Sequence, residues 1–144
     1  MRFLGRRLGR EGGAVAVEFA LIMPVLLLIV VGTIQFGRVW SQYQVFQGAA
    51  REGARCAAVQ AASATAGLTG CSIQGRIDEA SGAYTPAVPA AVTVGGAPSP
   101  GGCVTDLMRG QDVRVFWEQP LEINIPFWGD VTVSSTIEAT FRCE

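Results

Sequence analysis

The sequence lacks histidine and lysine altogether: its 144 residues include no histidine, and all 11 basic residues are arginines. Histidine is the commonest general acid–base residue of enzymes, and lysine is the residue that forms Schiff bases with substrates. The acidic pair Asp78–Glu79 is explained by a solvated helix face, and Ser134 and Ser135 do not follow the strand-to-helix motif of a hydrolase nucleophile. We therefore expect no enzymatic activity, no catalytic residue and no cofactor.

The chain also lacks an excess of charge of either sign, since its net charge is −1. A nucleic-acid-binding protein presents a basic face, so we expect no nucleic-acid partner. The arginines are nevertheless unevenly placed, and four of them lie in the first ten residues, opposed only by Glu11: Arg2, Arg6, Arg7 and Arg10. By the positive-inside rule, this basic leader (residues 1–13) predicts an N-terminus in the cytoplasm.

An apolar run over residues 14–34 follows the leader and holds a single formal charge, that of Glu18. A helix of this length covers roughly 30 Å, the thickness of the hydrocarbon core of a bilayer. The run therefore predicts a single pass through the cytoplasmic (inner) membrane, with everything from about Gln35 outside, in the periplasm or at the cell surface. A carboxylate inside a span costs about 2 kcal/mol or more, so Glu18 requires a partner or a function.

The four cysteines all lie on the predicted outer side of the membrane: Cys56, Cys71, Cys103 and Cys143. An even number of cysteines in an oxidising compartment predicts two disulfides, and three connectivities are open. A zinc site is the alternative, but the chain has no histidine and no C-x-x-C pair. We expect structural disulfides and no metal site.

Three interpretations of the N-terminal segment differ in how they explain Glu18. A secretory signal peptide has a shorter apolar region and a small-residue cleavage site, which Val31–Gln35 does not offer. A plain membrane anchor explains the length and the arginines but not the carboxylate. In the third interpretation, a cytoplasmic peptidase cuts after Gly13, and the new α-amino group of Ala14 is positively charged one helical turn from Glu18.

The third interpretation resembles the processing signal of type IV pilins and pseudopilins. The string from Gly13 to Pro24 is similar, more narrowly, to the start of the TadE-like family of Flp/Tad pilus assembly proteins, G-x-x-x-V-E-F-A-L-x-x-P. Phe36-Gly37-Arg38 fits the same family, and Ala49–Arg55 is similar to its A-A-R-E-G-A-R motif. The motif residues of this resemblance are Glu18, Phe19, Pro24, Ala50, Arg51, Glu52, Gly53, Ala54 and Arg55.

The resemblance implies a minor pilin or pseudopilin with a structural role in assembly of a Flp/Tad-type IV pilus. It implies processing by a prepilin peptidase between Gly13 and Ala14, and neutralisation of the new amine by Glu18. The implied partners are that peptidase, the membrane, the pilus assembly platform, and other pilins or a TadF-like pseudopilin that bind the N-terminal helix. The alternative is an unprocessed, single-pass membrane-anchored binding module, either a sensor or an adhesin involved in cell adhesion.

Beyond the membrane, a stripe of aromatic and then small residues at steps of three or four predicts that the helix continues over residues 35–66 and ends near Gly67 or Gly70. Trp40 and Tyr43 lie where interfacial aromatic residues are expected. Residues 67–144 then predict a small disulfide-containing ectodomain. Its expected elements are a short helix over 72–80 and strands over 91–94, 112–118 and 131–142.

The two prolines between residues 119 and 130 predict an edge strand or an extended connection there. Phe127 and Trp128 in this stretch are either an exposed membrane or partner contact, or ordinary core and turn packing. The whole chain is therefore predicted to be an α+β protein: a long transmembrane helix continuing into an ectodomain with an antiparallel sheet of about three strands. The family resemblance makes this fold type IV pilin-like.

Overall fold

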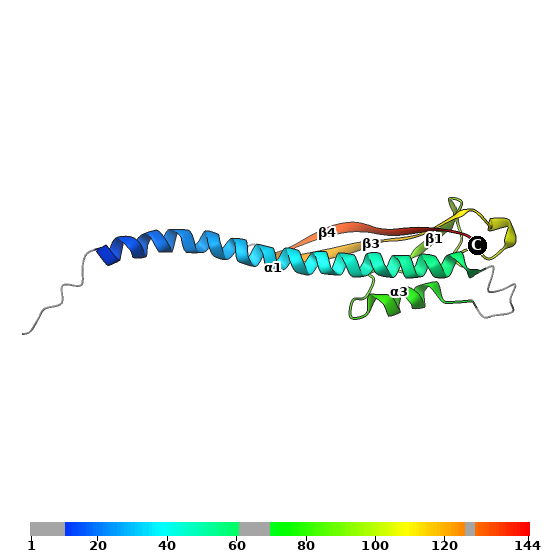
Figure 1. Cartoon of the computed structure of the whole chain (residues 1–144), viewed down its shortest axis with the longest axis horizontal. Helices are drawn as coiled ribbons and strands as arrows, with labels where there is room; N and C mark the ends of the chain where they lie inside the picture. The colour runs from blue at the N-terminus through cyan, green and yellow to red at the C-terminus, as the bar shows by residue number, and fades with distance from the viewer. Residues whose placement is uncertain (1–10, 61–69, 126–128) are drawn as a thin grey trace, which may run out of the picture.

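The computed structural model describes residues 11–60, 70–125 and 129–144 of the chain. A single helix, α1 (Glu11–Ala58), runs along almost the whole molecule, and the remaining elements gather beside its C-terminal half (Figure 1). These elements are α3 (Ile73–Ser81), β1 (Ala91–Val94), β2 (Ala97–Pro98), η1 (Asp106–Met108), β3 (Asp112–Ile125) and β4 (Gly129–Arg142). A long N-terminal helix followed by a small antiparallel sheet confirms the predicted α+β fold.

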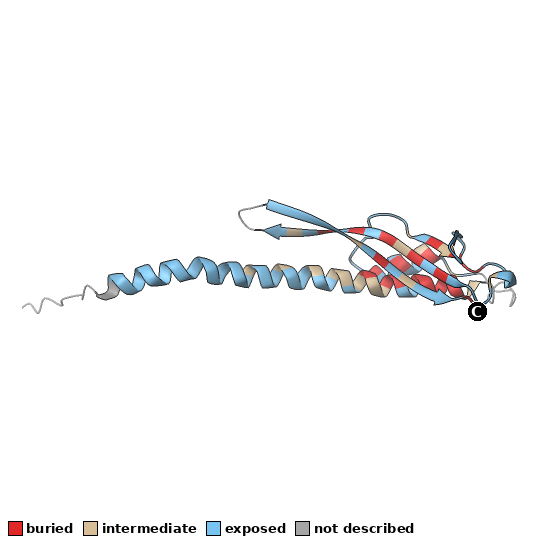
Figure 2. Cartoon of the chain, turned by 90° about the horizontal axis from the view of Figure 1, so that it is seen from above, coloured by how far each residue is buried: buried red, intermediate tan, exposed pale blue. Residues whose placement is uncertain are grey.

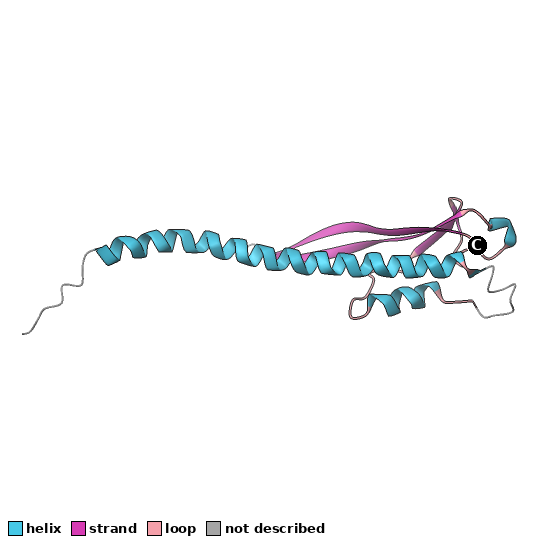
Figure 3. Ribbon diagram, viewed as in Figure 1, coloured by secondary structure: helices cyan, strands magenta, loops and turns pink. Residues whose placement is uncertain are grey.

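The two halves of α1 have different surroundings. Its N-terminal half stands free, and its C-terminal half is packed between the sheet on one side and α3 on the other (Figures 1 and 3). The change from exposed to buried side chains follows this division (Figure 2). Helix α1 ends at Ala58, and Gln60 is again helical; residues 61–69, in which the predicted end near Gly67 falls, lie outside the described residues.

The end of α1 is closed by tertiary contacts. The last carbonyl groups of a helix have no partner within the helix. Here the Ala57 carbonyl accepts a hydrogen bond from the Cys103 N–H at 2.9 Å, and the Ala58 carbonyl accepts one from the Glu144 N–H at 3.3 Å. Segments distant in sequence therefore meet at this point. The residues near Ala58 in the sequence do not by themselves predict the end of the helix.

The sheet has four strands in the order β2-β1-β3-β4, and all neighbours are antiparallel. Strand β1 covers the predicted residues 91–94, and β2 adds a two-residue strand to the three that were expected. For residues 119–125 the sequence left an edge strand and an extended connection open, and in the structure these residues form the second half of β3. They pair with β4 from Gln119↔Ser135 to Ile125↔Gly129.

Pro120 is compatible with this long strand because β3 has only one neighbour at that point. Strand β1 pairs with β3 between Val113 and Phe116 and goes no further, so beyond Phe116 β3 is an edge strand. Proline, which has no N–H to donate, is tolerated at such an edge. The edge-strand alternative of the prediction was therefore correct for residues 119–125. The predicted contact residues Phe127 and Trp128 lie outside the described residues.

The core lies where α1 meets the inner face of the sheet. The ring of Phe46 is 3% exposed and packs edge-on against Trp117 of β3, with ring centroids 6.3 Å apart. Toward the end of the helix the contacts become smaller, because α1 offers mainly alanine and glycine there, together with Cys56. Residues that are fully buried around this junction are Ala49, Ala50, Ala54, Ala57, Ile77, Val113, Val115 and Ile137.

A buried polar cluster joins the loop after α3 to the hairpin. The side-chain oxygen of Gln119 accepts hydrogen bonds from the Trp117 indole N–H at 3.2 Å and from the Ala87 N–H at 3.0 Å. Gln119 is only 6% exposed, and buried polar groups of this kind are costly unless they are paired. Nothing in the sequence distinguished Gln119 from a surface glutamine, because both of its partners are set by tertiary contacts.

Helix α3 confirms the short helix expected over residues 72–80. The Ser72 hydroxyl caps it by accepting a hydrogen bond from the Gly75 N–H at 3.1 Å, as N-cap serines do. Its apolar side chains Ile73 and Ile77 are buried against α1.

The four cysteines form two disulfides, as predicted, with the pairing Cys56–Cys71 and Cys103–Cys143. The first disulfide joins α1 to the residue just before the cap of α3. The second joins the loop before η1 to the end of β4. The two disulfides therefore cross-link the helix, the loop and the sheet.

Candidate functional site

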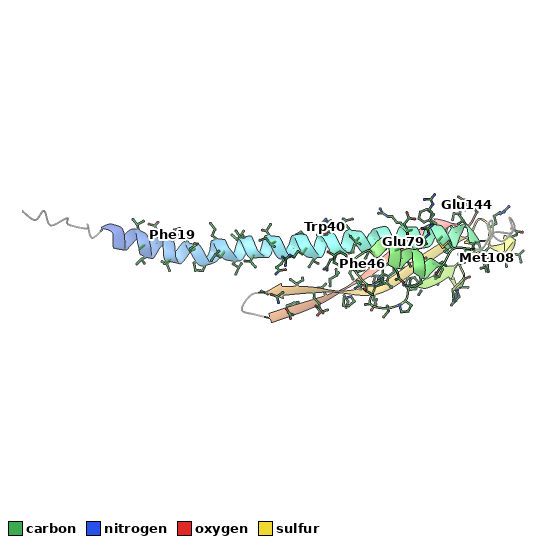
Figure 4. The ribbon with its side chains drawn as sticks, turned by 90° about the horizontal axis from the view of Figure 1, so that it is seen from below. Phe19, Trp40, Phe46, Glu79, Met108 and Glu144 are labelled. Carbon is green, nitrogen blue, oxygen red and sulfur yellow. A yellow bond between two sulfur atoms is a disulfide. The ribbon has the colours of Figure 1, made fainter. Side chains whose placement is uncertain are left out.

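The candidate site is the free N-terminal half of α1. Gly13, Ala14 and Glu18 all lie in its first turns, in regular helix, and all three residues are exposed. Phe19, labelled in Figure 4, is 61% exposed and projects from the helix far from the folded domain. The structure thus places the predicted cleavage site and the predicted carboxylate at one end of the molecule, one helical turn apart.

This part of α1 has the composition of a membrane span. It is the one helix among the described residues that is long and apolar enough to cross a bilayer, with a mean hydropathy of 2.8 in its most apolar window. None of that window is buried against the rest of the chain. Since exposed apolar surface of this extent is rare on a water-exposed helix, the segment is suited to contact lipid or other helices.

The side chain of Glu18 makes no hydrogen bond or ion pair with any other described residue. Pro24, two turns further on, lies inside α1, and the helix continues through it. Because proline lacks an N–H, the carbonyl oxygen four residues earlier receives no hydrogen bond from it. The free half of α1 therefore carries a carboxylate and a backbone carbonyl that a neighbouring molecule can satisfy.

A row of aromatic rings marks the point where α1 leaves its apolar run. Phe36 and Trp40 stack with ring centroids 6.1 Å apart, and Trp40 and Tyr43 lie at 5.9 Å. Trp40 is 53% exposed, whereas Tyr43 is partly buried and its hydroxyl accepts a hydrogen bond from Gln47 at 3.0 Å. Trp40 therefore remains suited to the membrane interface, while Tyr43 is already part of the folded domain.

The A-A-R-E-G-A-R segment has two different sides. Ala50, Gly53 and Ala54 are buried and let α3 and the sheet approach the helix backbone. Arg51, Glu52 and Arg55 are exposed and take part in no ion pair among the described residues. The small residues of the motif thus serve the fold of this chain, and its charged residues lie on the exposed side of the helix.

Gly53 offers a direct test of that packing. A methyl group at this position would lie 2.6 Å from Cγ1 of Ile77, which is fully buried in α3, whereas a methyl group at Gly48 would meet nothing within 4 Å. We expect Gly53→Ala to destabilise the domain, because overpacking of about 1–3 kcal/mol exceeds the roughly 1 kcal/mol gained in helix propensity. Gly48→Ala keeps only the gain and is expected to stabilise it by about 0.5–1 kcal/mol.

Denaturant unfolding of the full chain in detergent micelles, followed by near-ultraviolet circular dichroism, measures both variants. If Gly53→Ala were as stable as Gly48→Ala, the close contact between α1 and α3 would be wrong.

The comparisons with known proteins concern the same helix. The family model of TadE-like proteins matches residues 13–55, which run from the predicted cleavage site to the end of the A-A-R-E-G-A-R segment. No curated protein and no solved structure matches the chain. The match confirms the resemblance inferred from the two motifs, and it does not extend into the sheet. Over residues 13–55 the chain is therefore similar to TadE-like proteins.

Proposed function

We propose that this chain is a structural minor pilin or pseudopilin of a Flp/Tad-type IV pilus, processed after Gly13. The match to TadE-like proteins supports an association with such pili. The observation that carries the finer proposal is a bare apolar helix with its one carboxylate, Glu18, placed about one turn after Ala14. The helix would insert into the fibre or below it, and the ectodomain would cap the fibre or hold it to the secretion machinery.

The role of Glu18 in this proposal is to neutralise a charge that processing creates. Before cleavage the nitrogen of Ala14 is an uncharged amide. After cleavage it is an α-amino group, positively charged at neutral pH, at the positive end of the helix dipole. Glu18 of the same chain or of a neighbouring subunit would pair with this amine, and such a pair sets the register between helices.

The proposed partners follow from the same helix. A prepilin peptidase would cut between Gly13 and Ala14 from the cytoplasmic side. Other pilins, or a TadF-like pseudopilin, would pack against the exposed half of α1, and the assembly platform in the inner membrane would receive the processed subunit. In this proposal the chain acts through binding and has no enzymatic activity of its own.

Intact-mass measurement of the chain purified from cells that carry a prepilin peptidase tests the processing step. The expected mature chain begins at Ala14. Gly13→Val is expected to leave the chain uncut, while Gly12→Val, its matched neighbour, is expected to be processed normally. A chain that begins at Met1 or Arg2 in such cells would refute the proposal and favour the unprocessed alternative, a membrane-anchored sensor or adhesin.

A further inference from the structure

The far end of the β3–β4 hairpin carries an apolar face that the rest of the described chain does not cover. Along β3, alternate side chains point toward α1, and Trp117 and Leu121 on this face are 3% and 5% exposed. Further along the hairpin the same face opens, because the sheet and α1 diverge (Figure 2). Its outermost members are Ile125, Val131 and Val133, which are 37%, 44% and 47% exposed.

The opposite face of the same hairpin end is polar. The strand pairs Glu122↔Thr132 and Pro120↔Ser134 alternate with the apolar pairs Leu121↔Val133 and Ile123↔Val131. At the end of this face the Asn124 amide donates a hydrogen bond to the Asp130 carboxylate at 2.5 Å. The hairpin end is therefore amphipathic, with one side suited to an apolar medium and the other to water.

The position of the hairpin along α1 identifies that medium. Trp117 packs against Phe46, and from Trp117 the strand runs toward the N-terminal half of α1. The eight steps along the strand from Trp117 to Ile125 cover about 26 Å at roughly 3.3 Å each, and α1 covers the same distance in about 17 residues. In Figure 4 the hairpin end extends past the level of Trp40 on the side of Phe19.

The hairpin end thus lies level with the last turns of the apolar run of residues 14–34. If those turns lie in a bilayer, lipid that surrounds α1 at this level also reaches Ile125, Val131 and Val133. Deep insertion is not favoured, because β3 beyond Phe116 and the outer edge of β4 carry unpaired backbone groups, which hydrocarbon cannot satisfy. An amphipathic element of this kind is stable at the boundary between acyl chains and headgroups.

We propose that the end of the β3–β4 hairpin is a second membrane contact, in which Ile125, Val131 and Val133 bind phospholipid at the outer surface of the bilayer. The inference rests on the proposed function in one respect, namely that α1 spans the membrane. A helix alone is free to rotate about its axis in a bilayer, whereas a helix with a second contact beside it is not. The hairpin would therefore fix which face of α1 meets neighbouring helices.

Tryptophan quenching by lipids with brominated acyl chains tests this contact in the full chain, reconstituted in phosphatidylcholine vesicles. The background carries Trp40→Phe and Trp128→Phe and keeps Trp117, whose buried ring is a constant reference. Into it are introduced Val131→Trp, on the apolar face, and Thr132→Trp, its matched neighbour on the polar face. Val133→Trp repeats the measurement if the first substitution disturbs the fold, as judged by circular dichroism.

Two further positions calibrate the experiment: Leu26→Trp within the proposed span, and Leu107→Trp in η1, which is 90% exposed at the opposite end of the ectodomain. The quantity compared is the fluorescence that the introduced tryptophan adds to that of Trp117. For Leu26→Trp and Val131→Trp we expect this added fluorescence to be about twofold weaker in brominated than in unbrominated vesicles, as for rings in contact with acyl chains. Thr132→Trp and Leu107→Trp are expected to change little.

The other outcomes overturn the inference in distinguishable ways. Quenching of Leu26→Trp without quenching of Val131→Trp would remove the hairpin contact and leave the proposed function intact. Equal quenching of Val131→Trp and Thr132→Trp would show that lipid does not distinguish the apolar face of the hairpin end from its polar face. Emission from Val131→Trp that is insensitive to bromine but depends on the protein-to-lipid ratio would assign the face to a second copy of the chain. Absence of quenching at Leu26→Trp would refute the spanning helix, and the hairpin contact with it.

Discussion

A Glu18→Ala chain is expected to insert into the membrane normally and to fail in assembly. Removing a carboxylate from an apolar span lowers the cost of insertion by about 2 kcal/mol or more, so poor insertion cannot explain a loss of assembly. In the proposed function, the substitution removes the counter-charge of the new α-amino group of Ala14, which would then remain unpaired among apolar helices. The measurement is the number of pili on cells that express only the variant, together with its amount in the membrane fraction.

The control for this prediction is Glu18→Asp, which keeps the negative charge on a shorter side chain. It is expected to assemble at a reduced level, and N-terminal processing is expected to continue in both variants because Gly13 is unchanged. Cells with Glu18→Ala that form pili as abundantly as cells with the native chain would show that the charge pair is not needed. We expect the ectodomain to keep its fold in both variants, because the exposed Glu18 side chain has no contact with it.

Loss of the Cys103–Cys143 disulfide is expected to cost about 4 kcal/mol of folding stability, the largest effect of any change to the ectodomain proposed here. This bond closes a loop of 40 residues, and the entropy that a cross-link removes from the unfolded chain grows with the loop. It also stands beside the end of α1, where the Cys103 N–H donates to the Ala57 carbonyl. Denaturant unfolding of a Cys103→Ala/Cys143→Ala chain in micelles measures the loss.

The matched comparison is the Cys56→Ala/Cys71→Ala chain, which opens a loop of 15 residues and is expected to lose about 3 kcal/mol. Its effect falls on the attachment of α3 rather than on the meeting point of helix and sheet. If opening the shorter loop proved more damaging than opening the longer one, the account of these bonds as constraints on the unfolded chain would be wrong. In either variant α1 is expected to remain in the membrane, because residues 14–34 contain no cysteine.

The features that the sequence predicted are those that depend on near neighbours along the chain. The apolar run, the helix of α1, the capped helix α3 and the strand over 91–94 all follow from periodicity or from residues three or four positions apart. The family motif is of the same kind, because its residues are recognised by their spacing on one helix. The number of disulfides also followed, since it requires only that the cysteines share one compartment.

Tertiary structure alone decided how these elements meet. The pairing of Cys56 with Cys71 and of Cys103 with Cys143 depends on the path of the chain around α1, and cysteine spacing cannot supply it. The burial of Gln119 arises in the same way, from partners brought together by the fold.

The long hairpin shows most clearly which features local sequence predicts and which tertiary contacts decide. The two prolines between residues 119 and 130 left two possibilities open, an edge strand and an extended connection. The fold decided in favour of the strand, because β1 ends early and leaves Pro120 at a free edge. Spacing along the chain thus determined the apolar helix and the position of Glu18 on it. The level at which the hairpin lies beside that helix is set by contacts between residues more than 60 positions apart, such as Phe46 and Trp117.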